Sequence, residues 1–385
     1  MKRVNNIYDN ICDLNNIMSM SHKVCINTKN KNKVDKYELY LTEHLIDIKN
    51  LLSNKTYKIG KYNIFLIRES KLRLIMSQSI SDKVVNHLVA KYFLVDVFDK
   101  SFIDSSIATR KGKGTHYGMM LLKKYINEMK KKYDNIYVLK FDIKKYFYNI
   151  DHEIVKKIIS TKIKDKNAIS LINKIIDSTD EEYVNDNIVR LKNNEINKIK
   201  QNININEVEK NRMIEEINSI PLYEKGKGCP IGNYTSQTIA ILYLSELDHY
   251  IKEKLHIKAY IRYMDDGVLL HNDKKYLEYC LIEIKNILMK YKLELNEKKT
   301  QINSIKNGID FLGYKYYLKN NIVIMKLRNN TKKKFRKYSK DLVLLYKYDL
   351  LNKNELKCVI ASYKGHLKWG NCNNLYYKNL LQYLN

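Results

Sequence analysis

Apolar residues recur along the chain with two different spacings, which predict where helices and strands lie. A helical spacing dominates residues 1–55, apart from a polar, Lys/Asn-rich break at 27–33. Two short β-favouring blocks within residues 56–76 predict a hairpin. The helical spacing returns over 80–125, where a Gly- and Lys-rich stretch at 105–118 interrupts it. The first third of the chain is therefore predicted to consist of helices around one hairpin.

The central part of the chain contains two further β-rich segments. The first, at 136–142, ends in an aspartate. The second, at 259–271, has apolar residues on both sides of Asp265 and Asp266, which predicts strand, tight turn and strand. An amphipathic helix is predicted to follow at 274–290.

Two charged segments complete the pattern. Residues 178–225 are rich in Asn, Lys, Glu and Ile, which favours either a charged helical insertion or an extended loop. Residues 326–385 are predicted to be helical and basic. Their composition suits sequence-independent contacts with nucleic-acid phosphates.

Composition narrows the class of partner. The chain has 385 residues, of which 44% are hydrophobic, so it is long enough for two or three folded domains. Its net charge of +28, from 70 Lys+Arg against 42 Asp+Glu, indicates a polyanionic partner. We find no secretory signal and no apolar run of about 18 residues, so no membrane association is expected. The six scattered cysteines fit a reducing, cytoplasmic location.

Three aspartates are candidate metal-binding and catalytic residues. Asp265 and Asp266 are adjacent in the predicted turn, where they repel each other unless a cation lies between them. Such oxygen ligands suit Mg²⁺. An ordinary polar hairpin tip is the alternative, since Asp and Gly are common in turns. Asp142, at the end of the other β-rich run, would complete a two-metal site for in-line phosphoryl transfer.

The motifs around these aspartates resemble those of reverse transcriptases. Tyr-Met-Asp-Asp at 263–266 resembles the catalytic hairpin of that family, and the pattern Phe-Asp-Ile-Lys-x-x-Phe-x-x-Ile-Asp-His at 141–152 resembles the first catalytic motif of the bacterial enzymes. The resemblance extends over roughly residues 60–370 with the motif order preserved. It implies an α+β, right-hand polymerase fold with fingers, an antiparallel-sheet palm and a helical thumb.

The same resemblance suggests domain boundaries and cofactors. We expect the following domains: an N-terminal helical extension (1–55), fingers (56–135), a palm (136–320, with the charged insertion 178–225) and a thumb (321–385). Two Mg²⁺ ions are expected, with Mn²⁺ as a substitute. The expected partners are a template RNA or non-coding RNA, primer or product DNA, dNTPs, and a small accessory protein or a second copy of the chain.

Individual residues inherit expected roles from the family. Those expected to be catalytic are Asp142, Asp265 and Asp266, which also bind metal together with Ile143. Those expected to bind the nucleotide are Lys71, Arg73, Phe147, Gln237 and Lys299. Those expected to contact nucleic acid are Arg110, Lys111, Lys113, Gly232, Asn233, Tyr263, Met264, Gly313, Lys332, Lys333 and Lys334.

Several of these residues also have a purely structural explanation. Lys71 and Arg73 could lie on a solvated edge strand instead of holding a triphosphate, and Lys299 could be an exposed loop residue. Phe147, expected to exclude a 2′-hydroxyl, could be a core aromatic of the palm. Asp151 is expected to cap the helix that begins at His152 rather than to bind metal.

The subtype is indicated by one motif. Most related enzymes carry Gln-Gly-x-x-x-Ser-Pro before the central hairpin, whereas this chain has Gly-x-x-x-Ser-Gln at 232–237. That form resembles the reverse transcriptases of diversity-generating retroelements, a bacterial and phage group related to group II intron enzymes. The segment 362–370 resembles the same group, although its lone Trp369 could be a core residue. A defence-associated (anti-phage) reverse transcriptase and a non-catalytic RNA-binding protein are the alternatives.

Overall fold

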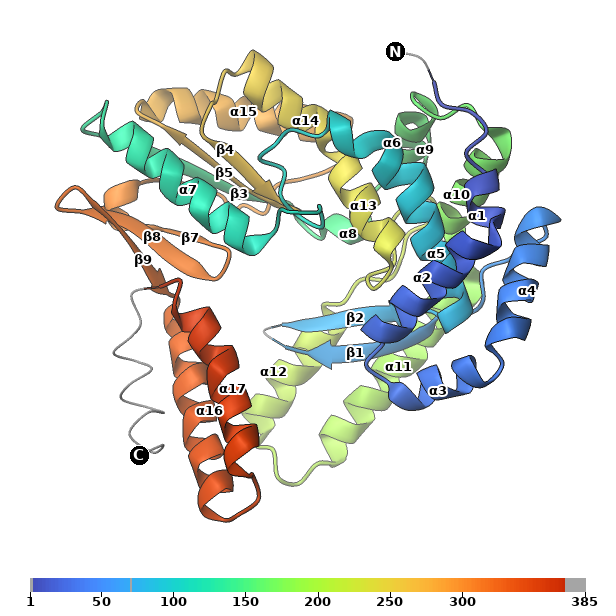
Figure 1. The fold of residues 1–385 in the computed structure, drawn as a ribbon. Helices are drawn as coiled ribbons and strands as arrows, with labels where there is room; N and C mark the ends of the chain where they lie inside the picture. Colours follow the sequence, from blue (N-terminus) through green and yellow to red (C-terminus); the bar gives the residue numbers. More distant parts are fainter. Residues whose placement is uncertain (1–2, 70, 371–385) are drawn as a thin grey trace. The chain divides into compact units, whose positions relative to one another are not determined.

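The N-terminal part of the chain is helical, as predicted. The structure, a computed structural model, describes residues 3–69 and 71–370 (Figure 1). Its first helices are α1 (Asp9–Cys12), α2 (Leu14–Asn27), α3 (Lys31–Leu39) and α4 (Leu41–Ser53). The predicted break at 27–33 is shorter than expected, because the Asn30 side chain accepts a hydrogen bond from the backbone N–H of Lys33 and so starts α3 early.

The predicted hairpin follows these helices. Strands β1 (Asn63–Arg68) and β2 (Leu72–Ser77) pair antiparallel, with Asn63 opposite Ser77 and Arg68 opposite Leu72. Helix α5 (Ile80–Val89) comes next. Its N-cap is Ser79, whose Oγ accepts a 3.0 Å hydrogen bond from the Asp82 N–H and donates a 2.7 Å hydrogen bond to the Asp82 carboxylate.

The chain divides into two compact units, each assembled from separate stretches. The first contains Met1–Ile103, Ile143–His249 and Asn286–Glu294. The second contains Asp104–Asp142, Tyr250–Lys285 and Leu295–Asn385. The predicted domain boundaries stay a prediction, and residues 371–385 of the expected thumb lie outside the described residues.

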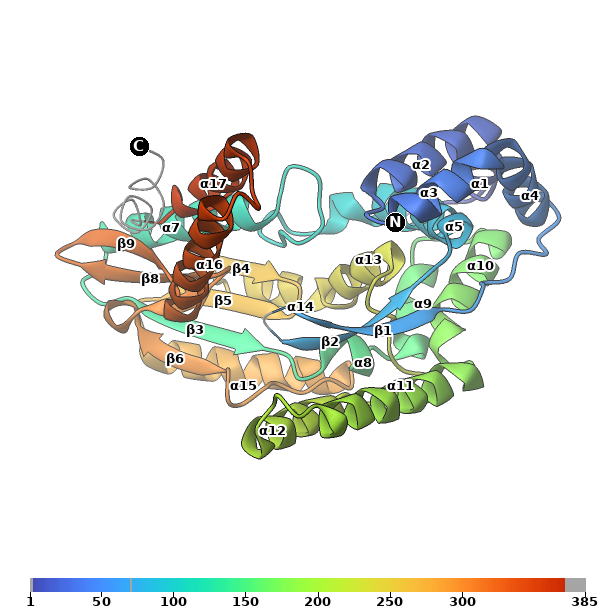
Figure 2. The same cartoon turned by 90° about the horizontal axis from the view of Figure 1, so that it is seen from below.

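In addition to α1–α5 and the hairpin, the first unit contains a series of helices. They include α6 (Asp96–Phe98), α8 (Tyr146–Asn149), α9 (His152–Ser160), α10 (Lys166–Ile176), α11 (Glu182–Gln201), α12 (Glu207–Asn218), α13 (Tyr234–Tyr243) and α14 (Ser245–His249). Helices α11 and α12 occupy most of the charged insertion, which settles its predicted alternatives in favour of helix (Figure 2).

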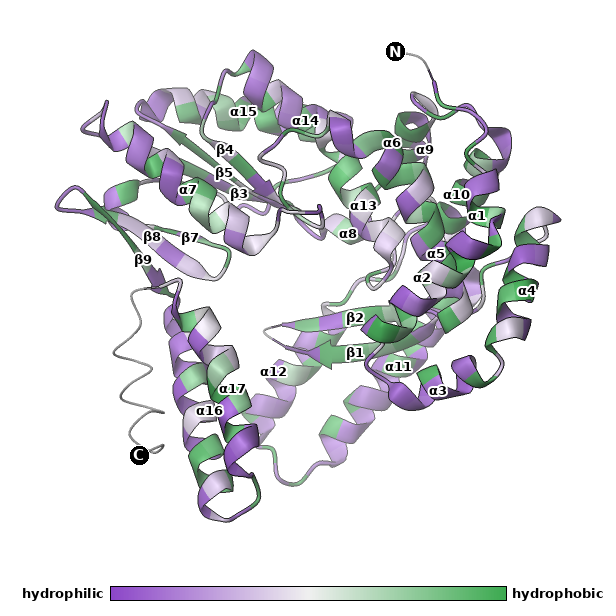
Figure 3. Ribbon diagram, viewed as in Figure 1, coloured by the Kyte–Doolittle hydropathy of each residue, from purple (hydrophilic) through white to green (hydrophobic). Residues whose placement is uncertain are grey.

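A four-stranded antiparallel sheet forms the centre of the second unit. Its strand order is β4–β5–β3–β6, and the strands are β3 (Tyr137–Asp142), β4 (Tyr260–Tyr263), β5 (Asp266–His271) and β6 (Gln301–Ser304). Helix α7 (Thr115–Lys130) covers one face, where its Met119, Leu122 and Ile126 bury against apolar side chains of β3, β4 and β5. These strands are the apolar segments in the middle of the sheet in Figure 3.

A second sheet and the predicted basic helices follow. Strands β7 (Ile309–Phe311), β8 (Tyr314–Lys319) and β9 (Ile322–Leu327) form an antiparallel meander. Helices α16 (Asn329–Lys347) and α17 (Lys353–Leu367) then pair through Phe335 and Tyr363. Helix α15 (Lys274–Lys290) was predicted at the same bounds. Within the described residues, no helix combines the length and apolarity that a bilayer crossing requires.

Candidate active site

The central hairpin places its two aspartates at the end of the sheet. Tyr263 pairs with Asp266 in the β4–β5 ladder, so Met264 and Asp265 form the two-residue turn. Met264 has a φ of +54°, a left-handed conformation of the kind that such turns require. Asp265 is therefore in the turn at the end of the sheet, while Asp266 already belongs to β5.

A buried arginine holds this turn from behind. The Arg262 guanidinium is fully buried and donates a 2.8 Å hydrogen bond to the carbonyl oxygen of Met264. It also lies 3.3 Å from Ser106 Oγ, and the Arg262 backbone exchanges hydrogen bonds with Ser105 and Ile107. The sequence analysis missed this role, although a cation within an apolar strand is a signal that could have revealed it.

The strand register brings Asp142 to the same place. Asp142 is directly opposite Asp266 in the β3–β5 ladder, and Phe141 is opposite Gly267. A Cβ at Gly267 would lie 2.2 Å from the Phe141 ring, so only glycine allows this register. The third carboxylate, predicted from a motif more than a hundred residues away, thus joins the other two.

Burial makes these carboxylates unfavourable as isolated anions. Burial raises the pKa of Asp265, and the neighbouring charge of Asp142 raises it further. Burial likewise raises the pKa of Asp266 to about 6, although Lys140 Nζ lies 3.2 Å away and opposes the shift. Asp266 Oδ1 is buried and has no hydrogen-bond partner among the described residues. An oxygen-rich, charge-crowded site with an unsatisfied acceptor fits a divalent cation.

Two lysines supply positive charge at the site. Lys140, which the sequence analysis missed, also donates to the backbone oxygen of Asp310 at 2.8 Å. Lys299 Nζ lies 2.5 Å from Asp142 Oδ2. Lys299 is exposed in the loop before β6, as the structural alternative expected, and it is also beside the candidate metal ligand. Its predicted role in nucleotide binding stays a prediction.

The sequence was then compared with known protein families. The family model described as reverse transcriptase (RNA-dependent DNA polymerase) matches residues 59–316, which is more than half of the chain. The chain belongs to this family. Membership confirms the predicted α+β right-hand polymerase fold.

Solved telomerase structures are also similar to this reverse transcriptase, at low identity. Telomerase from Candida albicans, solved with the TWJ fragment of telomeric RNA, is 13% identical, with a TM-score of 0.47 over 90% of this chain and 62% of the other. Apo telomerase from Candida tropicalis is 14% identical, with a TM-score of 0.41 over 67% of this chain and 46% of the other. The reverse transcriptase thus spans less than two thirds of these chains. A search of curated proteins found no match.

The predicted nucleotide-binding residues, apart from Lys299, belong to the first unit of the reverse transcriptase. Lys71 is exposed just before β2, and Arg73 is exposed on β2, where its Nη1 lies 3.6 Å from Glu69. Phe147 is half-buried on α8 and packs edge-on against Tyr146. It is therefore only partly a core aromatic. Their roles, and that of Gln237 on α13, stay predictions.

The loop before α13 is explained by packing within the first unit. The Met76 N–H donates to Ile231 O at 2.9 Å, and a Cβ at Gly232 would lie 2.9 Å from Met76 O. Gly232 also has a φ of +129°. The Asn233 side chain is buried and donates to Tyr62 at 3.1 Å, so this segment holds the hairpin whether or not it also contacts nucleic acid.

The predicted nucleic-acid contacts of the second unit are distributed over several elements. Arg110 donates to Ser106 O at 2.9 Å, Lys113 pairs with Asp104, and Lys111 is exposed. The remaining candidates lie in two turns and on one helix: Tyr263 and Met264 at the β4–β5 turn, Gly313 between β7 and β8, and Lys332, Lys333 and Lys334 on α16.

The alternative that Trp369 is a core residue is wrong. Trp369 is 36% exposed and stacks on His116, with ring centroids 4.7 Å apart, so it does not fill a core. Ile143, expected among the metal-binding positions, has a fully buried apolar side chain, which leaves its backbone carbonyl as the group able to bind a cation.

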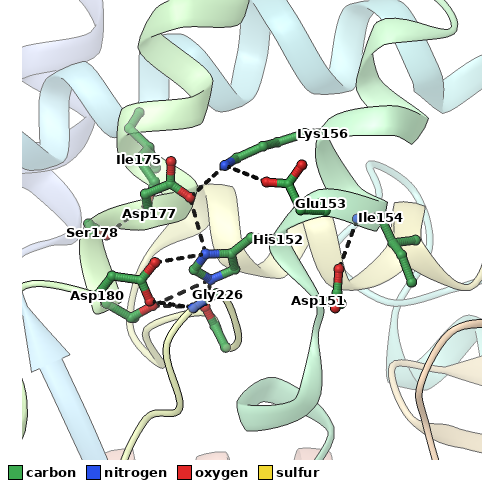
Figure 4. A network of polar contacts seen from close by, with 12 residues as sticks. Asp151, His152, Glu153, Ile154, Lys156, Ile175, Asp177, Ser178, Asp180 and Gly226 are labelled. Carbon is green, nitrogen blue, oxygen red and sulfur yellow. Dashed lines mark hydrogen bonds and ion pairs between the residues drawn. The ribbon is translucent and has the colours of Figure 1, made fainter.

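A histidine outside the carboxylate site anchors the loop 226–228 (Figure 4). His152 is buried, and its Nδ1 lies 3.1 Å from Asp177 Oδ1 and 3.5 Å from Asp180 Oδ2. Its Nε2 lies 2.8 Å from the carbonyl oxygen of Gly228. Among the described residues, this is the one group whose three potential metal ligands come within 4.8 Å of one another.

The polar side chains of this cluster form hydrogen bonds and ion pairs with other protein groups. Both ring nitrogens of His152 lie within hydrogen-bond distance of oxygen atoms, one of Asp177 and one of the Gly228 backbone. Lys156 Nζ lies 2.9 Å from Asp177, and the Gly226 N–H donates to Asp180 at 2.9 Å. Asp177 and Asp180 thus each have a second protein partner besides the imidazole. Asp151 is the N-cap of α9, as predicted, and also pairs with Lys292 at 2.5 Å.

We expect His152→Ala to destabilise the protein by about 2 to 3 kcal/mol, because it empties a buried position and removes the hydrogen bonds to Asp177 and to the Gly228 carbonyl oxygen. Urea unfolding followed by circular dichroism measures the change. His22→Ala, on the exposed side of α2, is the control and should change stability by less than about 0.5 kcal/mol. Equal effects of the two substitutions would mean that His152 does not hold the loop 226–228 in place.

Proposed function

We propose that this reverse transcriptase adds dNTPs to a primer 3′-end on an RNA template, with Asp142, Asp265 and Asp266 as its catalytic carboxylates. The observation that carries the proposal is the β3–β5 register, which brings three charge-crowded carboxylates to one sheet end and leaves a buried oxygen of Asp266 without a partner. Mg²⁺ suits these oxygen ligands, and Mn²⁺ is the expected substitute.

The residues around the carboxylates have separable tasks. Two divalent cations, when bound, would supply the charge that activates the primer hydroxyl and stabilises the leaving pyrophosphate. Asp142 and Asp265 hold them, and Asp266 supports the site through its ion pair with Lys140. Arg262 fixes the turn through Met264, so the carboxylates are positioned before substrate arrives.

The remaining predicted roles belong to the same proposal. Lys71 and Arg73 contact the triphosphate of the incoming dNTP, since both are exposed at the hairpin end and Arg can form bidentate contacts with phosphate. Phe147 excludes the ribose 2′-hydroxyl. The basic side chains of α16 contact the template–product duplex through its phosphates.

We propose that this protein is the reverse transcriptase of a diversity-generating retroelement. It would copy a template RNA together with a small accessory protein. The Gly-x-x-x-Ser-Gln sequence at 232–237 supports this assignment. The DNA that surrounds the gene provides the test: a pair of template and variable repeats is expected, whereas a cluster of defence genes and a non-coding RNA gene would favour the anti-phage alternative.

Asp265→Ala should reduce primer extension by roughly two orders of magnitude or more, because it removes charge from the proposed metal site. The assay uses purified protein, an RNA template with a DNA primer, dNTPs and Mg²⁺. Asp134→Ala, an exposed aspartate in the same unit, should retain extension. Near wild-type extension by Asp265→Ala would disprove the site assignment.

Replacing Lys332, Lys333 and Lys334 by Ala should weaken duplex binding and lower its salt dependence. Each lost phosphate contact reduces the slope of log affinity against log salt by about 0.9 on B-DNA, so a drop of up to about 2.7 is expected when three contacts are lost. Fluorescence anisotropy at several salt concentrations measures it. The matched control replaces Lys275, Lys285 and Lys290 on α15. If both triple variants give the same slope, the duplex does not contact α16.

Phe147→Ala should raise rNTP use relative to dNTP use by at least about tenfold, which corresponds to about 1.4 kcal/mol of discrimination. The phenyl ring excludes the 2′-hydroxyl sterically and offers no polar atom to replace its lost water. The measurement is kcat/KM for both nucleotide types. Tyr148→Ala, from the same helix and packed on Tyr223, should lower both values equally. An unchanged ratio in Phe147→Ala would mean that this ring only packs.

A further inference from the structure

The charged insertion at 178–225 packs against the fingers hairpin. Much of α11 and α12 is hydrophilic (Figure 3), but Val184 and Ile188 of α11, together with Ile220, are buried with Tyr62, Leu74 and Met76 of the hairpin region. Hairpins of two strands are marginally stable by themselves. The insertion therefore supplies the apolar layer that keeps β1 and β2 folded.

A single carboxylate of the insertion reaches the far end of that hairpin. Glu216 on α12 lies with Oε2 2.6 Å from Arg68 Nη1, and its Oε1 accepts a 3.2 Å hydrogen bond from the Leu72 N–H. Arg68 and Leu72 are the last pair of the ladder before the turn. Glu216 thus holds both strands at the point where the hairpin ends.

The chemistry of this contact is that of an ionised carboxylate. The Arg68 guanidinium holds the pKa of Glu216 below its ordinary value, so the carboxylate is charged at neutral pH. Both of its oxygens are used, one by a charged donor and one by a backbone donor. Because the two groups are partly exposed, the value of the contact lies in fixing geometry more than in stability.

We propose that Glu216 is a positioning residue for nucleotide binding and that this is how the insertion contributes to polymerisation. Leu72 lies between Lys71 and Arg73, so fixing the Leu72 backbone also fixes the starting points of both cationic side chains. The inference rests on the proposed role of Lys71 and Arg73 in holding the triphosphate. It adds to that role a residue about 140 positions away in the sequence.

Charge alone predicts the opposite effect from positioning. Glu216 is an anion close to Arg68 and near two further cations, so removing it makes the hairpin end more positive. If only charge mattered, the loss of Glu216 would strengthen the attraction for a triphosphate and lower the KM for dNTP. If positioning matters, the KM rises because the cations no longer converge.

The first experiment compares Glu216→Ala with Glu215→Ala, its exposed neighbour on the same helix. We expect Glu216→Ala to raise the KM for dNTP about tenfold, with kcat within about twofold and with unchanged affinity for primer–template. Glu216→Gln, which keeps an acceptor for the Leu72 N–H, should recover part of the loss. A lowered or unchanged KM in Glu216→Ala overturns the inference.

The second experiment does not depend on activity. Hydrogen exchange of the unliganded protein should be faster across residues 64–75 in Glu216→Ala than in wild type, and unchanged in Glu215→Ala. Unchanged exchange in Glu216→Ala overturns the inference as well. If the wild-type protein extends no primer, the proposed function is refuted. The hydrogen-exchange comparison would then still test whether Glu216 stabilises the hairpin.

Discussion

The register between β3 and β5 is the constraint on which the candidate site depends. Asp142 is opposite Asp266. If the pairing of the two strands shifted by one residue, one of these carboxylates would lie on the other face of the sheet and the three aspartates would no longer be together. The contact of Phe141 with Gly267 fixes this register sterically, since any larger residue would collide with the ring. A glycine that the sequence presents as part of a turn is therefore a register marker inside a strand.

The positive charges around the sheet end follow from this constraint. Three carboxylates brought together by register repel one another, and burial increases the cost. Three cationic side chains offset that cost: Lys140 on β3, Lys299 in the loop before β6 and Arg262 on β4, behind the turn. Among the described residues, Asp266 Oδ1 still has no hydrogen-bond donor. This buried oxygen is therefore able to bind a cation.

Sequence reasoning succeeded where the signal was local. The strand that ends at Asp142, the hairpin whose turn carries Asp265 and the N-cap at Asp151 were predicted from patterns within about a dozen residues, and helix was one of the two alternatives for the insertion. It failed where partners are distant. Arg262 and Lys140 look like ordinary charged residues until the fold places Met264 and Asp266 beside them.

The insertion shows why such distant contacts matter for function. Its sequence is mostly polar, and the few apolar residues that face the hairpin are too sparse to reveal a buried side. Lys71 and Arg73 are exposed on the hairpin, so its stability has to come from its opposite face and from its ends. Packing from α11 serves the first need and Glu216 the second. On this argument the insertion and the hairpin form one structural element, although about a hundred residues separate them in the sequence.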